Sequence, residues 1–315
     1  NSPGEEGNLG LSLSTSWNAS RVSDAEKLVF EITELGFKEI ELSFNLLPQA
    51  VTTIEKLVAL GKIKVSSLHN YCPIPDGLTR EQALPDCYSM ASLDEEERAQ
   101  AIKFTKRTME CAKRLGAGAV VLHCGRVEVA DRTRDLINIY EKAGKDNLEF
   151  ARLKSDIVKE RENRSKPFLE KALNSLDTLG SFAGRLGISL GVETRFYYRE
   201  IPTLEEIGLI LDKLKGSNIG YWHDAGHAQV MENLGFSRHI DFLTRYGQRM
   251  IGSHLHDLLG CRDHMAPGKG GLDFKKILPY LKKDAINVIE AHSPASAVDL
   301  KESKVFLEKL LDDRL

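Results

Sequence analysis

Six ionisable side chains stand at the ends of short apolar runs in the sequence, where buried strands would finish. They are three histidines and three carboxylates, namely His69 in KVSSLHN, His123 in AVVLHCG, Glu193 in ISLGVET, Asp224 in IGYWHDAGH, His254 in MIGSHLHD and Glu290 in INVIEAH. If the fold brings these ends together, the groups would repel or desolvate one another unless a cation lay between them. Imidazole and carboxylate are ligands that Zn²⁺ and Mn²⁺ accept, so the pattern predicts a metal site with Zn²⁺ or Mn²⁺ as cofactor.

Two further histidines lie near these ends. His227 is three residues after Asp224, so a tight turn would return it to the same cluster, and His264 lies in the loop GCRDHMAPGKGGLDF. Both are interpreted as metal ligands or as groups that contact substrate. The other four histidines are expected to lie outside the site, and strand alternation directs the first of them toward the helices: His223, His239, His256 and His292.

The apolar runs that precede these residues belong to a longer repeat. Eight runs rich in β-branched residues alternate with segments whose apolar residues recur at spacings of three and four, which is typical of amphipathic helices. Eight strand–helix units predict an α/β fold, a (β/α)8 TIM barrel, whose active sites lie at the C-terminal ends of the strands. No GxGxxG follows the first run, which disfavours an open, doubly wound sheet that binds a dinucleotide. The predicted strands are Leu9–Ser14, Glu39–Ser43, Ile63–Leu68, Ala119–His123, Ile188–Glu193, Ile219–Asp224, Met250–His254 and Asn287–Glu290, and the predicted helices include Val22–Leu35, Glu95–Leu115, Leu204–Leu214, Phe274–Leu281 and Val298–Leu311.

Length and composition fit one globular domain over residues 1–315. The chain has 315 residues, of which 42% are hydrophobic and 28% are charged. Residues 126–166 depart from the repeat, because this segment is long, polar and charged. We predict a helical insertion after the fourth strand, either a solvated excursion or a lid or contact with a second copy of the chain in a homo-oligomer.

Charge and cysteine usage exclude several classes of protein. The formal net charge of −3 does not indicate a nucleic-acid or anionic-membrane partner. No apolar run approaches the roughly 18 residues that span a bilayer. The five cysteines are scattered and form no CxxC pair, so they predict reduced thiols in a cytoplasmic protein without a membrane partner.

Seven motifs of the chain, taken together, resemble those of a known protein family. The segments SLHN, VVLHCG, GVET, YWHDAGHA, HLHD, RDHMAPGKGGLDF and VIEAH, in this order, resemble the xylose isomerase-like TIM-barrel superfamily. That superfamily includes the sugar isomerases and epimerases and the AP endonuclease family 2. The resemblance covers nearly the whole chain and implies the barrel fold.

The isomerase and epimerase branch implies a site with one divalent metal. Its four ligands would be Glu193, Asp224, His254 and Glu290. The resemblance implies that Glu193 and Glu290 are also the catalytic residues, one removing a proton beside a carbonyl and the other returning it, while the metal stabilises an enediolate. The residues expected to bind a small sugar-like substrate are His227, Arg262 and, in the segment TRFYYREIP, Arg195.

The endonuclease IV-type branch is the alternative. Its zinc cluster would add His69, His123, His227 and His264 to those four ligands and would cleave a phosphodiester at an abasic site in DNA. One aspartate of that branch aligns with Arg262, although Asp263 stands beside it. The loops after the first strands lack a basic stripe for a DNA backbone, so a small-molecule substrate is favoured and nucleic acid is kept as the alternative partner. A lyase or dehydratase using the same proton chemistry, or a barrel that binds without catalysis, also stays open.

Overall fold

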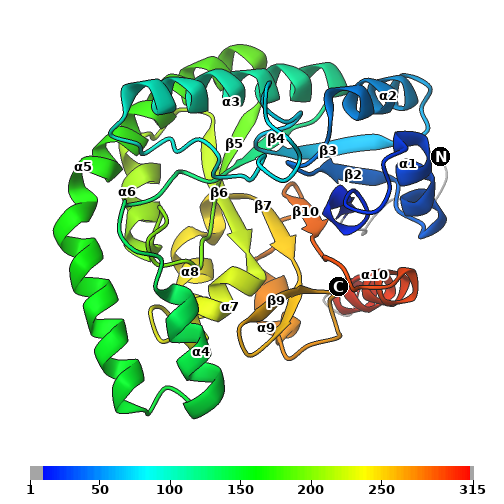
Figure 1. Cartoon of the computed structure of the whole chain (residues 1–315). Coiled ribbons are helices and arrows are strands. Elements are labelled where there is room, and N and C mark those ends of the chain that lie inside the picture. The colour runs from blue at the N-terminus through cyan, green and yellow to red at the C-terminus, as the bar shows by residue number, and fades with distance from the viewer. Residues whose placement is uncertain (1–9, 313–315) are drawn as a thin grey trace.

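The computed structural model describes residues 10–312. Eight parallel strands close into a barrel in the order β1-β10-β7-β6-β5-β4-β3-β2, and helices surround it (Figure 1). The predicted (β/α)8 barrel is confirmed, and each predicted strand position holds one of these strands. Leu9, the expected start of the first strand, lies outside the described residues. The barrel strands are β1 (Leu11–Ser14), β2 (Glu39–Leu42), β3 (Lys64–His69), β4 (Ala119–Leu122), β5 (Ser189–Glu193), β6 (Ile219–Asp224), β7 (Met250–Leu255) and β10 (Ile286–Ile289).

The helices begin and end where local sequence signals place them, as α3 (Glu95–Leu115) illustrates. Asp94 precedes it and its carboxylate accepts a hydrogen bond from the backbone N–H of Glu96 at 2.8 Å. The helix ends at Gly116, whose φ of 71° is a left-handed conformation that glycine adopts without a Cβ clash. The other helices around the barrel are α1 (Ala25–Glu34), α2 (Pro48–Ala59), α5 (Leu148–Leu186), α6 (Leu204–Lys213), α7 (Ala225–Asn233), α8 (His239–Tyr246), α9 (Phe274–Ile277) and α10 (Ala297–Asp312). Within residues 10–312, no helix combines the length and apolar character that crossing a membrane requires.

Trp222 fills the interior of the barrel beneath the strand ends. Its side chain is fully buried, and its ring meets that of His254 edge to face at a centroid distance of 5.3 Å. Two glycines make room for the indole, because a Cβ at Gly252 or Gly191 would lie 2.1 or 2.7 Å from its ring carbons. The indole therefore packs against His254 from the interior of the barrel.

The insertion after β4 consists of α4 (Thr133–Ala143) and the first part of α5, which extend beyond the barrel at the lower left of Figure 1. The last part of the insertion and the helix that leads to β5 form one continuous helix, which starts at Leu148. The helix continues through Pro167, because a helix of 39 residues tolerates the loss of the one hydrogen bond that proline cannot donate.

A second apolar cluster fastens this insertion to loops at the barrel mouth. Leu136 of α4 and Phe150 of α5 belong to one buried cluster with Phe196, from the loop after β5, and with Leu258. Arg161 of α5 is also buried. It donates to the backbone carbonyl of Glu200 in the same loop at 2.9 Å.

A hairpin that the sequence did not predict follows β7. It consists of β8 (Asp257–Leu259) and β9 (Arg262–Met265), which pair antiparallel. The buried carboxylate of Asp257 accepts hydrogen bonds from the backbone N–H groups of Gly268 and Gly270, both at 2.9 Å. Asp257 therefore holds the glycine-rich loop in place.

Candidate metal centre and active site

The six side chains that the sequence places at strand ends lie together at the mouth of the barrel. Five of them are more than nine-tenths buried, and they come from six different strands or the residues directly after them: His69 (β3), His123 (after β4), Glu193 (β5), Asp224 (β6), His254 (β7) and Glu290 (after β10). The closed ring of parallel strands accounts for this convergence, because all their C-terminal ends face the same side.

Glu193, Asp224, His254 and Glu290 form the centre of the site. Their nearest ligand atoms all lie within 4.8 Å of one another. His254 Nδ1 lies 2.7 Å from Glu193 Oε1, 3.2 Å from Glu290 Oε2 and 3.7 Å from Asp224 Oδ2. Burial alone would lower the pKa of His254, but the neighbouring carboxylates, Glu290 first, outweigh it and raise that pKa well above its ordinary value.

This centre fits a divalent metal ion. Three buried carboxylates surround one imidazole, and Asp224 Oδ2 has no hydrogen-bond partner among the described residues. A buried carboxylate oxygen without a donor is costly, and a cation among the four groups would satisfy it. Carboxylate oxygens together with imidazole nitrogen suit Zn²⁺ and Mn²⁺.

Four histidines are oriented as metal ligands usually are, with one ring nitrogen held from outside and the other directed at the carboxylates. The outer acceptors are the Asn70 carbonyl for His69 Nδ1 (3.1 Å), Asp86 Oδ1 for His123 Nδ1 (3.1 Å), the Thr194 carbonyl for His227 Nδ1 (2.9 Å) and Glu41 for His254 Nε2 (3.0 and 3.1 Å). An acceptor fixes the proton on one nitrogen, so the other can present a lone pair.

Glu193 lies within ion-pair distance of three histidines and one arginine. Its Oε2 lies 2.5 Å from Arg195 Nη1, 2.9 Å from His123 Nε2 and 3.9 Å from His69 Nε2. Burial would raise the pKa of Glu193, but Arg195 and the histidines outweigh it, so the carboxyl is ionised and its pKa lies well below the usual range. His69, His123 and Glu193 form a second group of potential ligands beside the centre.

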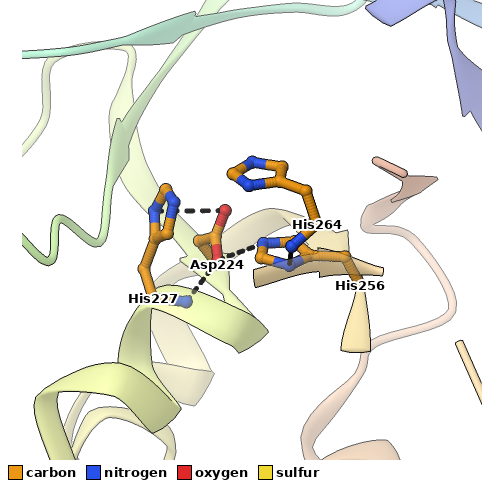
Figure 2. Close-up of side chains that lie close together, drawn as sticks. All are labelled: Asp224, His227, His256 and His264. Carbon is orange, nitrogen blue, oxygen red and sulfur yellow. Dashed lines mark hydrogen bonds and ion pairs between the residues drawn. The ribbon is translucent and has the colours of Figure 1, made fainter. Parts of the chain in front are cut away.

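A third group of potential ligands consists of Asp224, His227, His256 and His264, which are shown in Figure 2. His256 Nε2 lies 2.8 Å from Asp224 Oδ1, and His256 Nδ1 accepts a hydrogen bond from the backbone N–H of His264 at 2.9 Å. Both nitrogens of His256 are therefore committed, and its role is to orient Asp224. We expected His256 outside the site, and this expectation is wrong because β7 continues to Leu255 and directs the ring onto Asp224.

The structure places Asp263, rather than its neighbour Arg262, beside the site histidines. The buried-side oxygen Asp263 Oδ2 lies 3.1 Å from His264 Nδ1 and 3.5 Å from His227 Nε2, without a hydrogen-bond partner among the described residues. Arg262 is exposed, and its nearest polar contact is the sulfur of Met265 at 4.0 Å. The structure thus brings His227 and His264 to the site together with Asp263 and leaves Arg262 on a neighbouring surface cavity.

His264 is held in an unusual conformation. Its φ of 55° is the only positive value of a non-glycine residue in the described part of the chain. Its ring is stacked between His256 and His292, at centroid distances of 4.2 and 3.9 Å. Backbone conformations of this kind cost about 1–3 kcal/mol and are found at functional sites. His292, which we expected outside the site, therefore supports it and lines its cavity.

Several site residues gave no usable signal in the sequence. Glu41 lies inside a strand, between Ile40 and Leu42, whereas Asp86 and Glu200 lie in loops, and none of them follows a strand. Asp86 pairs with His123 at 3.1 Å, and Glu200 with Arg195 at 3.2 Å. Glu41 could have been found only from its position, because a carboxylate in a strand buried on both faces needs a partner.

A cavity of about 530 Å³ opens above these groups. Glu193, Glu290 and His227 form part of its wall, as does the aromatic ring of Phe196. Four arginines line it as well, and all come from the segment after β4 or the loop after β5: Arg126, Arg134, Arg195 and Arg199. The cavity is therefore lined by both the potential metal ligands and guanidinium groups.

Comparison with known sequences gives a family match. The chain matches the family model described as xylose isomerase-like TIM barrel over residues 29–309. Among curated proteins, the uncharacterized protein y4fM of Sinorhizobium fredii is 24% identical over 246 residues, which cover 77% of this chain and 67% of that protein.

Comparison with solved structures identifies proteins of the same fold. A D-tagatose 3-epimerase-like protein has a TM-score of 0.67 at 19% identity, covering 96% of this chain and 97% of that chain. The 3-keto-D-glucoside 4-epimerase YcjR from E. coli has a TM-score of 0.68 at 16% identity, with coverages of 96% and 100%. The IolI protein with a zinc atom has a TM-score of 0.68 at 16% identity, with coverages of 97% and 99%. At these identities the likeness establishes the fold.

Proposed function

Because this chain belongs to the xylose isomerase-like TIM barrel family, we propose that it is a divalent-metal-dependent isomerase or epimerase of a small sugar-like molecule. One observation carries the proposal. Glu193 and Glu290 come from strands separated in the ring by β6 and β7, and their carboxylates meet at one metal-ligand cluster beneath a cavity of about 530 Å³.

The proposed chemistry is proton transfer at a carbon next to a carbonyl. One of the two glutamates removes the proton, and the other carboxyl returns a proton to the same or the neighbouring carbon. Arg195 holds Glu193 in place, while Glu290 faces His264 Nε2 at 3.6 Å.

Glu193, Asp224, His254 and Glu290 are the residues that would hold the metal. When bound, a divalent ion supplies positive charge that polarises the carbonyl oxygen and stabilises the charge that develops on it. The zinc atom of the related IolI structure supports Zn²⁺ as the first metal to test, with Mn²⁺ as the second.

The arginines suggest that the substrate carries an anionic group, such as a phosphate. Arg134 has no anionic partner among the described residues, and its guanidinium lies over the ring of Tyr197 at 5.2 Å. Arg199 has only a loose contact with Asp131, at 3.7 Å. Guanidinium groups with free donors recognise phosphate and carboxylate, so an anionic substituent directed at this wall would place the remainder of the sugar over the glutamates.

The test is solvent exchange. We expect the protein loaded with Zn²⁺ or Mn²⁺ to incorporate deuterium from D₂O beside the carbonyl of at least one substrate in a panel of ketoses and ketose phosphates, as followed by NMR. Glu290→Gln and Glu193→Gln should each abolish incorporation while circular dichroism shows a folded barrel. Exchange that persists in Glu290→Gln would contradict the proposed proton transfer.

A zinc phosphodiesterase of the endonuclease IV type is the second candidate. It is favoured by the two groups of potential ligands that flank the centre, one with His69 and His123 and the other with His227 and His264. Asp263 supports this reading, because it occupies the place beside the two latter histidines where that branch needs an aspartate.

Metal stoichiometry separates the two candidates. About one ion per chain, measured by elemental analysis of protein purified without added metal or chelator, supports the isomerase. Two or three zinc ions per chain, together with chelator-sensitive nicking of a duplex that contains an abasic site, would support the phosphodiesterase.

A further inference from the structure

The imidazole of His254 forms a hydrogen bond with the carboxylate of Glu41, which belongs to a different strand of the barrel. Glu41 of β2 places both carboxylate oxygens near His254 Nε2, at 3.0 and 3.1 Å. The two residues are 213 positions apart in the chain, and both are fully buried. Apart from His254, the hydrogen-bond partner of this carboxylate in the described structure is Ser67, whose Oγ donates to Glu41 Oε2 at 2.8 Å.

The orientation of the ring gives this contact its chemical meaning. His254 Nδ1 is the nitrogen that faces Glu193, Asp224 and Glu290. To coordinate a metal, Nδ1 must present a lone pair, and the ring proton must then reside on Nε2. A carboxylate that accepts from Nε2–H favours this tautomer, fixes the ring orientation and makes Nδ1 a stronger ligand.

Packing restrains the same ring but does not select its tautomer. The imidazole is nearly parallel to that of His69, at a centroid distance of 5.9 Å, and meets Trp222 edge to face. Neither contact is a hydrogen bond to a nitrogen of the His254 ring. Glu41 is thus the group that distinguishes one ring nitrogen of His254 from the other.

A purely space-filling role does not explain a glutamate at this position. Burying a carboxylate without solvent is expensive, and a leucine would fill a similar volume more cheaply. Neighbouring positions of β2 are occupied by Ile40 and Leu42, which are fully buried apolar residues. The carboxylate at position 41 therefore indicates a requirement for charge at His254.

We propose that Glu41 is a positioning residue that holds His254 in the tautomer and orientation required of a metal ligand, with Ser67 holding Glu41. This inference rests on the metal-dependent function proposed above. It extends the site by a residue that touches neither the substrate nor the metal and acts only through His254.

The experiment is a metal titration of the full-length apoprotein. Zn²⁺ affinity is measured by competition with a chromophoric chelator, and Co²⁺ absorption reports the ligand geometry. We expect Glu41→Gln and Glu41→Leu to weaken Zn²⁺ binding by about 10–100-fold and to change the Co²⁺ spectrum. Ser67→Ala should weaken binding in the same direction by a smaller factor.

Controls separate positioning from general damage. Glu232→Gln removes a carboxylate that accepts from the backbone N–H of His239 at 2.6 Å, outside the metal cluster, and should leave Zn²⁺ affinity unchanged. Unchanged Zn²⁺ affinity in folded Glu41→Gln and Glu41→Leu would overturn the inference and leave the proposed function standing. If both fail to fold, an unchanged affinity in Ser67→Ala overturns it instead. Failure of the wild-type chain to bind any divalent metal would overturn the proposed function itself.

Discussion

The guanidinium of Arg195 bridges two buried carboxylates, lying 2.5 Å from Glu193 Oε2 and 3.2 Å from Glu200 Oε1. Replacing Arg195 by methionine would leave both carboxylates buried without their main cation. We expect the free energy of unfolding to fall by about 3–5 kcal/mol, measured by urea denaturation.

A matched control is Arg249→Met, which breaks an exposed ion pair with Asp212 at 2.6 Å and should cost less than about 1 kcal/mol. Adding Glu193→Gln to Arg195→Met should recover part of the loss, because one uncompensated charge disappears. Equal costs for the two arginine variants would contradict the buried-pair interpretation.

Removal of the metal should destabilise the fold. Any ion that binds only the folded state raises the free energy of unfolding, by about 4 kcal/mol when its free concentration is a thousand times its Kd. We expect chelation to lower Tm in calorimetry, and added Zn²⁺ or Mn²⁺ to restore it. In Asp224→Asn the effect of the chelator should shrink, whereas an identical Tm with and without chelator would count against a metal at the centre.

Stability should fall in mild acid through His239. Burial lowers the pKa of this imidazole to about 4, whereas an unfolded histidine titrates near about 6.5. As pH falls between those values the unfolded chain binds a proton that the folded chain does not. The free energy of unfolding should therefore decrease, by up to about 1.4 kcal/mol per pH unit from this residue.

The hydrogen bonds around His239 can be made by a neutral ring. Its Nε2 lies 3.1 Å from His223 Nε2, and its Nδ1 lies 3.0 Å from Gln229 Oε1. A neutral ring satisfies both contacts when its Nδ1–H donates to Gln229 and its Nε2 accepts from His223. Denaturant titrations at several pH values should show a shallower acid slope in His239→Gln, and an unchanged slope would refute the assignment.

The guanidinium wall should set substrate preference. We expect Arg134→Gln and Arg199→Gln each to raise KM for a phosphorylated substrate about tenfold or more, because each removes charge-assisted hydrogen bonds. KM for the unphosphorylated parent sugar should stay nearly constant. The matched control is Arg152→Gln, on the outer part of α5, which lines another surface cavity. Equal changes in KM for both sugars would show that the arginines do not bind the phosphate.

Crowding at the barrel floor should limit substitution of glycine. A Cβ at Gly252 would lie 2.1 Å from the Trp222 ring, so Gly252→Ala should cost about 1–3 kcal/mol or more and disturb the metal centre through His254. Gly247→Ala is the control, because its nearest neighbour would be a ring carbon of Tyr280 at an ordinary 3.5 Å. Comparable Tm values for the two variants would contradict this account.

The sequence was sufficient for the barrel because each strand is a short apolar run with a polar end. That regularity also predicted that Glu193, Asp224, His254 and Glu290 lie together, because the C-terminal ends of the strands converge independently of the loop conformations. The resemblance added roles for these residues, which stay predictions, and it did not indicate that Asp263 rather than Arg262 faces the site histidines. The polar pattern of the loop does not reveal which of two adjacent residues in β9 points inward.

Residues that support the site from outside the strand ends could not be predicted in the same way. The contact of Glu41 with His254 could not be predicted, because it forms only when closure of the barrel brings β2 and β7 together, and these strands are far apart in the chain. His256 depends on one further residue of strand, and element ends are the least certain feature of a sequence prediction. Asp86 reaches His123 from a long loop whose path the sequence does not indicate.

The hydrogen bond from Arg161 to the Glu200 carbonyl connects the inserted helix to a loop that lines the candidate site. A protein engineer who shortened α5 to shrink the enzyme would cut the tether of the loop that carries Arg195 and Phe196. The loop that carries the guanidinium paired with Glu193 would then lose one of its anchors. Deletion of the inserted part of α5 should therefore loosen one wall of the cavity at the candidate site.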